Sequence, residues 1–494
     1  MVRRVDAAIE KMNLDPLIRQ YKGGGTSSYH PKMLLKVLVY AYTQQIYSSR
    51  KIAKALRENI YFMWLSGNSR PDFRTINRFR GEVLGKVMTE IFTAVLELLI
   101  EEGYVKLEHY FLDGTKIEAN AGKYTYIWAK STKHSKDRLQ KKVQQLLEEV
   151  ERVNEEEEEA YGDRDLEELG EEAEIDADRL EKKIQELDEI LRRELDEGEG
   201  KPEEETKKRA KAVRTLQTEY LPRLRNYEEQ ERILGDRGSY SKTDEEATFM
   251  RMKDDPLRTA QLKPAYNVQI GTENQFVIGL SVHQRPADTG CLVPHLEGLR
   301  ARLGRLPEKL IADAGYGSEE NYVYLQARGV QGFVKYSTFH QEQKKRSRKT
   351  RFLAEQFPYD EAKDQFVCPD GRRMLYRETS RFRTANEYLK EVRVYECEDC
   401  SDCALRAECT RAKGNRRIQV SFALQELRSR ARDNLLSDEG KTLRSRRPVE
   451  AESVFGRWKQ NWQFRRFLLR GLQKVETELG LLGMAHNISK MAAA

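Results

Sequence analysis

Between residues 106 and 336 the chain alternates short apolar strands with an amphipathic helix, and two of the strands end in a carboxylate. Tyr110-Phe-Leu leads directly into Asp113-Gly, and Leu310-Ile-Ala leads into Asp313-Ala-Gly. Further strands are predicted over 265–271, 275–284 and 330–336, with Asn274 in the turn between the first two and a helix over 289–302. The order strand, hairpin, helix, strand, helix, strand predicts an α/β domain with a mixed sheet.

Residues 1–105 show helical spacing of apolar residues and predict an all-α domain. The expected boundaries are a break at Gly23-Gly-Gly, a first-turn proline at Pro31, a cap at Ser48 or Ser49 before a helix over 50–59, and a further start at 71–75. The last helix carries Arg74, Asn77, Arg78 and Arg80. A basic final helix favours a helix-turn-helix DNA reader, and a plain helical bundle with solvated arginines is the alternative.

An acidic helical insertion is predicted over 130–250. Two apolar stripes define it, one of Leu139, Val143, Leu146, Leu147, Val150 and Val153, the other of Ile184, Leu187 and Leu191. Charged residues fill the other faces, so we expect a coiled-coil-like hairpin of helices, with turns at 155–159 and 198–202.

The near-neutral net charge of +6 conceals a strong asymmetry. Residues 151–205 hold 26 acidic and 8 basic side chains, a net charge of −18 that leaves +24 for the rest of the chain. Residues 406–474 alone hold 18 basic and 7 acidic side chains. Such a concentration favours nucleic acid as a partner, and a basic face balanced by the chain's own acidic segment is the alternative.

The composition also excludes some classes of protein. The most apolar run, 83–100, is broken by Lys86, Glu90 and Glu97, so no transmembrane helix is expected. Residues 1–13 hold charges and no apolar core of a signal peptide, which indicates a cytoplasmic protein.

Five of the six cysteines lie between residues 368 and 409. Cys397, Cys400, Cys403 and Cys409 follow one another closely, with Cys368 upstream, after a basic loop over 344–351. In a chain without a secretion signal, this spacing favours a closed, structural Zn²⁺ site. An iron–sulfur cluster and a reduced cluster without metal are the alternatives, and Cys291 is expected to be a small core residue.

A third acidic candidate, Glu452, lies in Pro-Val-Glu-Ala-Glu-Ser-Val-Phe-Gly amid arginines. Each carboxylate alone has a structural explanation, because strand-end aspartates cap turns and helical glutamates are usually solvated. Together, Asp113, Asp313 and Glu452 could hold two Mg²⁺ ions against a phosphodiester, since hard cations prefer carboxylate oxygens.

Many ordered blocks of the chain resemble the DDE transposases of bacterial insertion sequences. Residues 29–35, 47–53 and 71–80 are similar to the N-terminal transposase domain of that family, and Asp113-Gly-Thr-Lys and Asp313-Ala-Gly-Tyr-Gly to its two aspartate blocks. Residues 266–269 and 287–289 are similar to its intervening strands and turn. Glu452-Ser-Val-Phe-Gly, followed by 464–472 and Ala485-His-Asn, resembles its glutamate block.

The resemblance implies an RNase H-like catalytic domain over 106–343 and 418–494, after an N-terminal DNA-binding domain over 1–105. The insertion over 130–250 and a basic cysteine-rich insertion over 344–417 would interrupt the catalytic domain. The implied function is binding of the terminal inverted repeats of an insertion sequence, with cleavage and strand transfer by an Asp-Asp-Glu triad. The resemblance also implies two Mg²⁺ or Mn²⁺ ions as cofactors and double-stranded DNA as the partner. It further implies a homodimer in the DNA complex and a location in the bacterial cytoplasm, at the nucleoid.

The implied triad is Asp113, Asp313 and Glu452. The DNA-binding residues carried over or inferred are Arg74, Asn77, Arg78, Arg446, Arg447, Lys459, Arg465 and Arg466. Lys459 lies two helical turns after Glu452 and matches the lysine of the related Tyr-Arg-Glu-Lys signature, whose contact is transposon-end phosphate. The tyrosine and arginine of that signature are replaced by Ser445 and Pro448, so Arg444, Arg446 or Arg447 would substitute for them.

Several alternatives stay open at this point. Glu450 competes with Glu452, which we prefer because it keeps the spacing to Phe455-Gly456. Asp288 is either a fourth acidic ligand or, as we favour, a turn cap. Trp458 and Trp462 are expected in the core rather than stacked on a base. A nuclease that cuts without joining, or a catalytically silent, zinc-stabilised DNA-binding protein, are the alternative functions.

Overall fold

The structure is a computed structural model that describes residues 1–21, 29–161, 175–197, 204–252, 261–343 and 352–493. The predicted glycine break at 23–25, the turn at 198–202 and the basic loop at 344–351 lie outside the described residues. Contacts divide the chain into two compact units, Met1–Asn120 with Ala265–Ala494, and Ala121–Pro264. Within the described residues, no helix is long and apolar enough to cross a bilayer.

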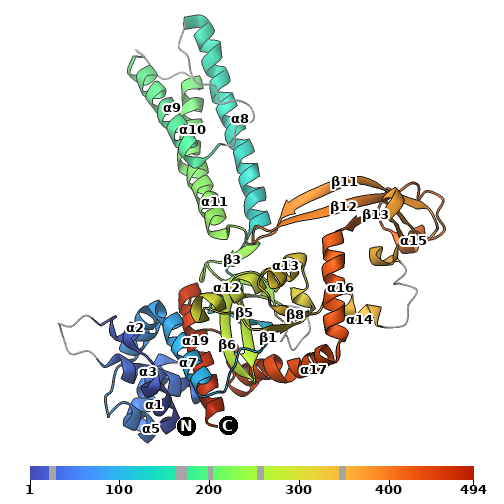
Figure 1. The fold of residues 1–494 in the computed structure, drawn as a ribbon. Coiled ribbons are helices and arrows are strands. Elements are labelled where there is room, and N and C mark those ends of the chain that lie inside the picture. The colour runs from blue at the N-terminus through green and yellow to red at the C-terminus, as the bar shows by residue number, and fades with distance from the viewer. Residues whose placement is uncertain (22–28, 162–174, 198–203, 253–260, 344–351, 494) are drawn as a thin grey trace. The chain divides into compact units, whose positions relative to one another are not determined.

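A mixed sheet forms the centre of the first unit (Figure 1). Strand β1 (His109–Glu118) runs antiparallel to β5 (Leu262–Glu273) and parallel to β7 (Lys309–Ala312), which runs parallel to β8 (Gln331–Val334). Strand β6 (Phe276–His283) pairs with β5 across a tight turn in which Asn274 and Gln275 have φ angles of 52° and 61°. The predicted mixed α/β sheet is thus confirmed, in agreement with an RNase H-like domain.

Helices cover this sheet. They are α12 (Leu292–Leu303), α13 (Glu319–Ala327), α14 (Phe339–Glu342), α16 (Phe422–Leu436), α17 (Asp438–Arg447) and α19 (Leu472–Met491). Leu435 and Leu443 pack with Phe111, Ile311 and Phe333 in one apolar cluster, which fixes α16 and α17 against β1, β7 and β8.

Helix α19 contributes a side-chain amide that binds the edge of β6 as a neighbouring strand would. The side chain of Asn487 accepts a hydrogen bond from the backbone N–H of Val277 at 2.8 Å and donates one to the carbonyl of Val277 at 2.7 Å. Both contacts fall on β6, and His486 contacts the carbonyl of Gln275 at 2.9 Å. The Ala485-His-Asn block therefore satisfies backbone groups of the sheet, which a buried strand edge requires.

The N-terminal helices belong to the same compact unit as the sheet. They are α1 (Val2–Lys11), α2 (Asp15–Ile18), α3 (Pro31–Thr43), α4 (Ser49–Glu58), α5 (Ile60–Leu65), α6 (Phe73–Arg78) and α7 (Met88–Glu101). Pro31 opens α3 as predicted, and the Asp72 carboxylate caps α6 by accepting the N–H of Thr75 at 2.7 Å. Ser48 is the N-cap of α4, although no side-chain hydrogen bond completes that cap.

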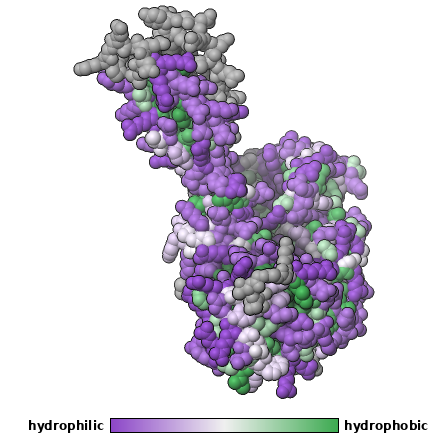
Figure 2. All heavy atoms as spheres, turned by 90° about the vertical axis from the view of Figure 1, so that its left-hand side faces the viewer, coloured by the Kyte–Doolittle hydropathy of each residue, from purple (hydrophilic) through white to green (hydrophobic). Residues whose placement is uncertain are grey.

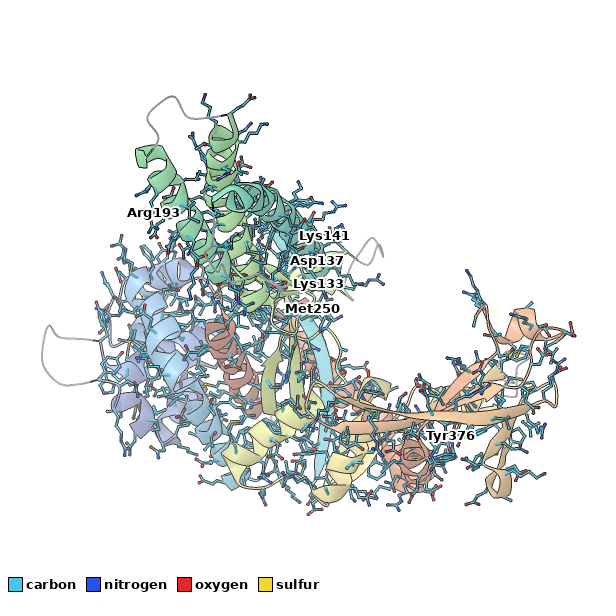
Figure 3. All side chains as sticks on the ribbon, turned by 90° about the horizontal axis from the view of Figure 1, so that it is seen from above. Lys133, Asp137, Lys141, Arg193, Met250 and Tyr376 are labelled. Atoms are coloured by element: carbon cyan, nitrogen blue, oxygen red, sulfur yellow. The ribbon has the colours of Figure 1, made fainter. Side chains whose placement is uncertain are left out.

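The second unit is a bundle of long helices joined to short strands. They are α8 (Ala129–Tyr161), α9 (Ala177–Glu197), α10 (Glu204–Thr215), α11 (Leu221–Leu234), β2 (Tyr126–Trp128), β3 (Ser239–Ser241) and β4 (Thr248–Arg251). Both predicted stripes contribute to its core, together with residues of α10 and α11, although the side chain of Val153 lies outside the described part of the first stripe. Charged side chains such as Lys133, Asp137 and Lys141 lie on the exposed face of α8 (Figure 3), and the unit's surface is largely hydrophilic (Figure 2).

Two details of the predicted hairpin are wrong. Residues 155–159, expected as a turn, belong to α8. The apolar residues Val213, Leu216, Leu221 and Leu224 add a third helical layer to the bundle. A π-helical segment (Leu216–Tyr220) joins α10 to α11, so the five-residue step from Leu216 to Leu221 departs from the heptad spacing that identifies a coiled coil.

The cysteine-rich segment forms a separate five-stranded sheet in the order β13-β12-β11-β10-β9. Its elements are β9 (Tyr359–Asp360), β10 (Gln365–Val367), β11 (Arg373–Arg383), β12 (Leu389–Cys397), α15 (Arg406–Cys409) and β13 (Arg417–Val420). Strands β11 and β12 extend as a long ribbon (Figure 1). Beyond the ends of these strands, Asn386 donates to Glu320 at 2.7 Å and accepts from Arg285 at 2.9 Å, so the tip of the ribbon contacts the residues that flank the central sheet.

Candidate active site

The strand register aligns two of the predicted carboxylates. Phe111 pairs with Ile311, and Ile311 pairs with Phe333, all in parallel strands. Asp113 and Asp313 each follow their paired residue by two positions, and side chains two apart lie on the same face of a strand. The two aspartates therefore lie side by side on the face that α16 and α17 cover.

A helix with irregular turns brings the third carboxylate to this face. Helix α17 continues through a π-helical turn that begins at Pro448 and ends at Glu452. Proline lacks the N–H that an α-helix needs, which favours such an irregularity. In a straight α-helix, side chains five residues apart point about 140° away from each other. The π turn instead lets Arg447 and Glu452 meet.

Arg447 contacts all three predicted triad residues. Its Nη2 lies 2.9 Å from Oδ1 of Asp113 and 3.5 Å from Oδ2 of Asp313, and its Nη1 lies 3.0 Å from Oε1 of Glu452. Arg447 is 9% exposed and Asp113 is 8% exposed, so their contact is shielded from water, whereas the side chains of Asp313 and Glu452 are 35% and 52% exposed. The structure thus gathers three carboxylates from β1, from the end of β7 and from the helix around one guanidinium.

Glu450 has different partners from Glu452. Its carboxylate accepts the backbone N–H of Gln275 at 2.7 Å and pairs with Arg446 at 3.0 Å, and the residue is 5% exposed. Arg446 also lies over the ring of Phe111 at 5.4 Å. Glu450 therefore connects the helix to the hairpin turn, whereas Glu452 joins the two aspartates.

Asp288 lies beside the same carboxylates. Its Oδ1 accepts hydrogen bonds from the amides of Asn267 at 2.8 Å and Gln269 at 2.9 Å, both on β5. A Cβ added at Gly114 would lie 2.7 Å from the same oxygen, so only glycine fits next to Asp113. The Asp288 carboxylate thus binds side chains of the sheet and does not form the turn cap that we expected from the sequence.

The buried Tyr316 lies close enough to these carboxylates for their negative charge to affect its pKa. Burial raises the pKa of the Tyr316 phenol well above its ordinary value, and the carboxylates of Asp288, Asp113 and Asp313 raise it further. The phenol donates a hydrogen bond to the side-chain carbonyl of Gln269. Tyr316 is therefore a neutral hydrogen-bond donor below the acidic cluster.

Lys335 is a candidate residue that the sequence reasoning missed. By the register of β7 with β8, it follows Phe333 by two positions and takes the same place on its strand as Asp313 does. Burial lowers the pKa of the Lys335 ammonium, and the nearby Arg447 and Arg444 lower it further. The sequence does show a strand that ends in a lysine, but an ammonium group is not a metal ligand, so that signal alone does not predict a metal site.

The predicted DNA-binding residues of the N-terminal helices lie on the surface. Arg74, Asn77 and Arg78 of α6 are exposed. The guanidinium groups of Arg50 and Arg74 lie 5.2 Å and 5.8 Å from the ring centre of Phe73, so two arginines flank one exposed aromatic ring. Arg50, at the start of α4, was not among the predicted residues.

The predicted contacts after Glu452 divide into exposed and buried side chains. Arg465 and Arg466 are exposed, and the backbone of Arg466 forms a bridge with Glu118 at the end of β1. Lys459, in contrast, is 7% exposed. A second π-helical segment, Arg457–Asn461, changes the helical phase on which its predicted position beside Glu452 depended. Trp458 and Trp462 are both buried, as expected.

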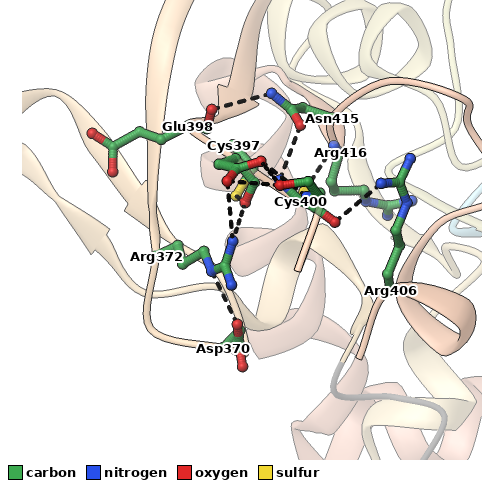
Figure 4. Close-up of polar contacts among 10 residues, drawn as sticks. Asp370, Arg372, Cys397, Glu398, Cys400, Arg406, Asn415 and Arg416 are labelled. Carbon is green, nitrogen blue, oxygen red and sulfur yellow. Dashed lines mark hydrogen bonds and ion pairs between the residues drawn. The ribbon is translucent and has the colours of Figure 1, made fainter. Parts of the chain in front are cut away.

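All five clustered cysteines line one small cavity of the second sheet, with Cys397 and Cys400 shown in Figure 4. They carry free thiols. The backbone N–H of Arg416 donates to Sγ of Cys400 at 3.4 Å, and Asn415 accepts the N–H of Cys400 at 3.0 Å. Burial, followed by a hydrogen bond with Cys400 and the charge of Cys368, raises the pKa of Cys397 to about 12.

Within the described ranges, no group of three or more His, Cys, Asp or Glu side chains is arranged to hold a metal ion. The predicted zinc site is therefore not confirmed. A high thiol pKa favours the protonated form, which is a poor metal ligand, unless a cation compensates for burial. At the acidic site, the arginine lies between the carboxylates that a metal would need.

Comparison with known families supports the resemblance. Residues 1–82 match the family described as transposase domain (DUF772), and residues 367–492 match the transposase DDE domain family. The second match includes Glu452, whereas Asp113 and Asp313 lie outside both matched ranges. Searches of the curated proteins and of the solved structures gave no match. The two matched regions are thus similar to transposase families, which is consistent with a DDE transposase of an insertion element.

Proposed function

We propose that the protein binds the terminal inverted repeats of its insertion element and catalyses metal-dependent DNA cleavage and strand transfer. The observation that carries this proposal is the convergence of Asp113, Asp313 and Glu452 on one cationic group. Three carboxylates around one point repel one another unless a cation is present, and the one from Asp113 is buried, so their convergence favours a functional site.

The donor set suits Mg²⁺ or Mn²⁺. Carboxylate oxygens are the ligands that both ions prefer, and these three already surround a positive charge. Asp113, Asp313 and Glu452 would hold the metal, with Asp288 close enough to contribute charge. When bound, the metal supplies the charge compensation that phosphoryl transfer between DNA strands requires.

The chain's own cations would bind and orient the DNA. Lys335 follows β8 as Asp313 follows the adjacent β7. Arg465 and Arg466 lie on the exposed segment beside the end of β1. Lysine and arginine near phosphates release counterions and fix the position of the duplex without reading its sequence. Lys459 would contribute only if its largely buried side chain became accessible.

Recognition of the terminal repeats is assigned to α6. Arginine and asparagine can each form paired hydrogen bonds with a base edge in the major groove, and Arg74, Asn77 and Arg78 are exposed on this helix. Substituting Asn77 should relax sequence preference, whereas substituting Arg465 should weaken binding to all sequences alike.

A structural Zn²⁺ in the cysteine cavity remains part of the proposal. Cys368, Cys397, Cys400, Cys403 and Cys409 supply more thiols than the four that zinc takes, so one would be spare. Metal analysis of the purified protein, repeated for Cys400→Ser and for Cys291→Ser, tests it. Zinc at one equivalent that Cys400→Ser alone removes is expected, and its absence from the wild-type protein would contradict the proposal.

The catalytic proposal is tested with duplexes that carry the inverted repeats flanking the coding region. Asp113→Asn, Asp313→Asn and Glu452→Gln should each abolish cleavage and leave DNA affinity nearly unchanged, because each removes a metal ligand and no phosphate contact. Glu450→Gln is the matched control and should still cut. If Glu450→Gln is inactive and Glu452→Gln cuts, the glutamate assignment is wrong.

The same assay separates the alternatives. Cleavage without a joined product at any Mg²⁺ or Mn²⁺ concentration would indicate a nuclease of the same fold. Specific binding without cleavage would indicate a silent DNA-binding protein. A homodimer that bridges two ends is proposed from the family resemblance alone, and the mass of the DNA complex would show it.

A further inference from the structure

Arg447 contacts all three carboxylates that the proposed function assigns to a metal. Its two terminal nitrogens contact Asp113, Asp313 and Glu452 at 2.9, 3.5 and 3.0 Å. Its Nε is buried and, among the described residues, has no hydrogen-bond partner. The hydrogen bonds and ion pairs of the guanidinium, among the described residues, go to these three carboxylates.

We propose that Arg447 is an internal cation that stabilises the metal-free site and must leave the carboxylates when a divalent ion binds. This inference rests on the proposed function of the same three residues. It adds a competition between an arginine and a metal to that function.

The competition follows from charge and from space. Mg²⁺ binds oxygen ligands at about 2.0–2.1 Å, which leaves no room for a guanidinium among the same atoms. Arg447 and Arg444 already lie close enough to Lys335 to lower the pKa of that lysine, after the larger effect of burial. A divalent ion beside an unmoved Arg447 would therefore place several positive charges around three carboxylates.

Once displaced, the Arg447 guanidinium would be able to bind a DNA phosphate. An arginine bound to a phosphate through two hydrogen bonds is among the strongest pairs in proteins. DNA backbone at the mouth of the site would hold Arg447 away from the carboxylates and so favour metal binding. By linkage, DNA and metal would then increase each other's affinity, which limits metal loading in the absence of DNA.

The test measures Mn²⁺ binding to the full chain without DNA by calorimetry. Arg447→Gln should bind Mn²⁺ at least about tenfold more tightly than wild type, because it removes charge-assisted hydrogen bonds that compete with the metal. Arg446→Gln, the neighbouring arginine that pairs with Glu450, is the control and should bind as wild type does. Equal or weaker binding by Arg447→Gln overturns the inference.

A measurement on the wild-type protein keeps the inference testable if Arg447→Gln does not fold. Phenylglyoxal modifies accessible guanidinium groups, and mass spectrometry identifies the modified arginine. Saturating Mn²⁺ should increase modification of Arg447 several-fold and leave that of Arg446 unchanged. Modification of Arg447 that stays constant or falls contradicts the inference.

Failure of the proposed function gives a different result. Asp113→Asn and Glu452→Gln should each weaken Mn²⁺ binding in both the wild-type and the Arg447→Gln backgrounds. If neither changes Mn²⁺ binding in either background, the triad is not the metal site, whatever Arg447 does. If both weaken it but Arg447→Gln binds no tighter than wild type, the triad holds the metal and only the competition is wrong.

Discussion

A buried ion pair joins the N-terminal helices to α19, and breaking it should lower the free energy of unfolding of both. Arg80 lies 3.8 Å from Glu478, and both side chains are essentially inaccessible to water. Glu478 also accepts the backbone N–H groups of Leu468 and Leu469, each at 2.8 Å. We therefore choose Arg80→Met, which removes the positive charge, keeps an apolar stem, and leaves Glu478 buried without its cation.

Arg80→Met should lower the free energy of unfolding by about 3–5 kcal/mol, the usual result of removing one partner from a buried pair. The size of this loss should depend on pH. Burial raises the pKa of Glu478, and Arg80 opposes that rise, so Arg80→Met should raise the pKa further. A carboxyl whose folded-state pKa lies above its unfolded-state value binds more protons when folded, so stability falls as the pH rises. The defect should therefore shrink as the pH is lowered from 7 toward 5.

Native-state hydrogen exchange of peptides from α3 and α19 is the assay, because a chain of two units does not unfold in one step. The matched control is Arg78→Met, which breaks an exposed pair with Glu82 and should cost less than about 1 kcal/mol. If Arg80→Met loses no more stability than Arg78→Met, or if its defect is independent of pH, the reasoning is refuted.

Gly114→Ala should abolish cleavage and destabilise the protein by about 1–3 kcal/mol, because its methyl group would overlap Gln269 and Asp288; normal cleavage by this variant would contradict the geometry. Burial, followed by the charge of a nearby arginine, lowers the pKa of His283 to about 4, so the unfolded state binds more protons as the pH falls below about 6.5. The contribution of His283 to stability should thus decrease by about 2 kcal/mol between pH 7 and pH 5, and His283→Gln should reduce this dependence in native-state hydrogen exchange of peptides from β6; equal slopes would refute it. Lys335→Gln should slow single-turnover DNA cleavage by about tenfold with an unchanged melting temperature if, as proposed, this cation lies next to the reacting phosphate; an unchanged rate would exclude that role.

The local pattern of residues was enough to predict most elements of the central sheet. The apolar run before Asp113 became β1, and the alternating residues on either side of Asn274 became β5 and β6. Pro31 and Asp72 begin their helices as expected. Such features depend on neighbours within one or two turns, which the sequence displays directly. The layers of the helical bundle depend on packing between distant segments, and there the two-helix expectation was wrong.

The predicted carboxylates were also identified from the sequence, but their geometry was not. The π-helical turn after Pro448 decides which of Glu450 and Glu452 lies beside the aspartates, and a straight helix would give a different answer. The role of Arg447 as their common partner follows from the packing of this helix on β1 and β7.

The sequence by itself determined the segments of the sheet, the acidic strand ends and the families of the two matched regions, because these are encoded by short runs of residues. Only the tertiary structure decided that Arg447 lies among the three carboxylates and that Lys335 lies at the end of the strand next to that of Asp313. The physical reason is that charges attract or repel according to their distance in space, and folding places residues 113, 313, 335 and 447 together although they lie far apart in the chain.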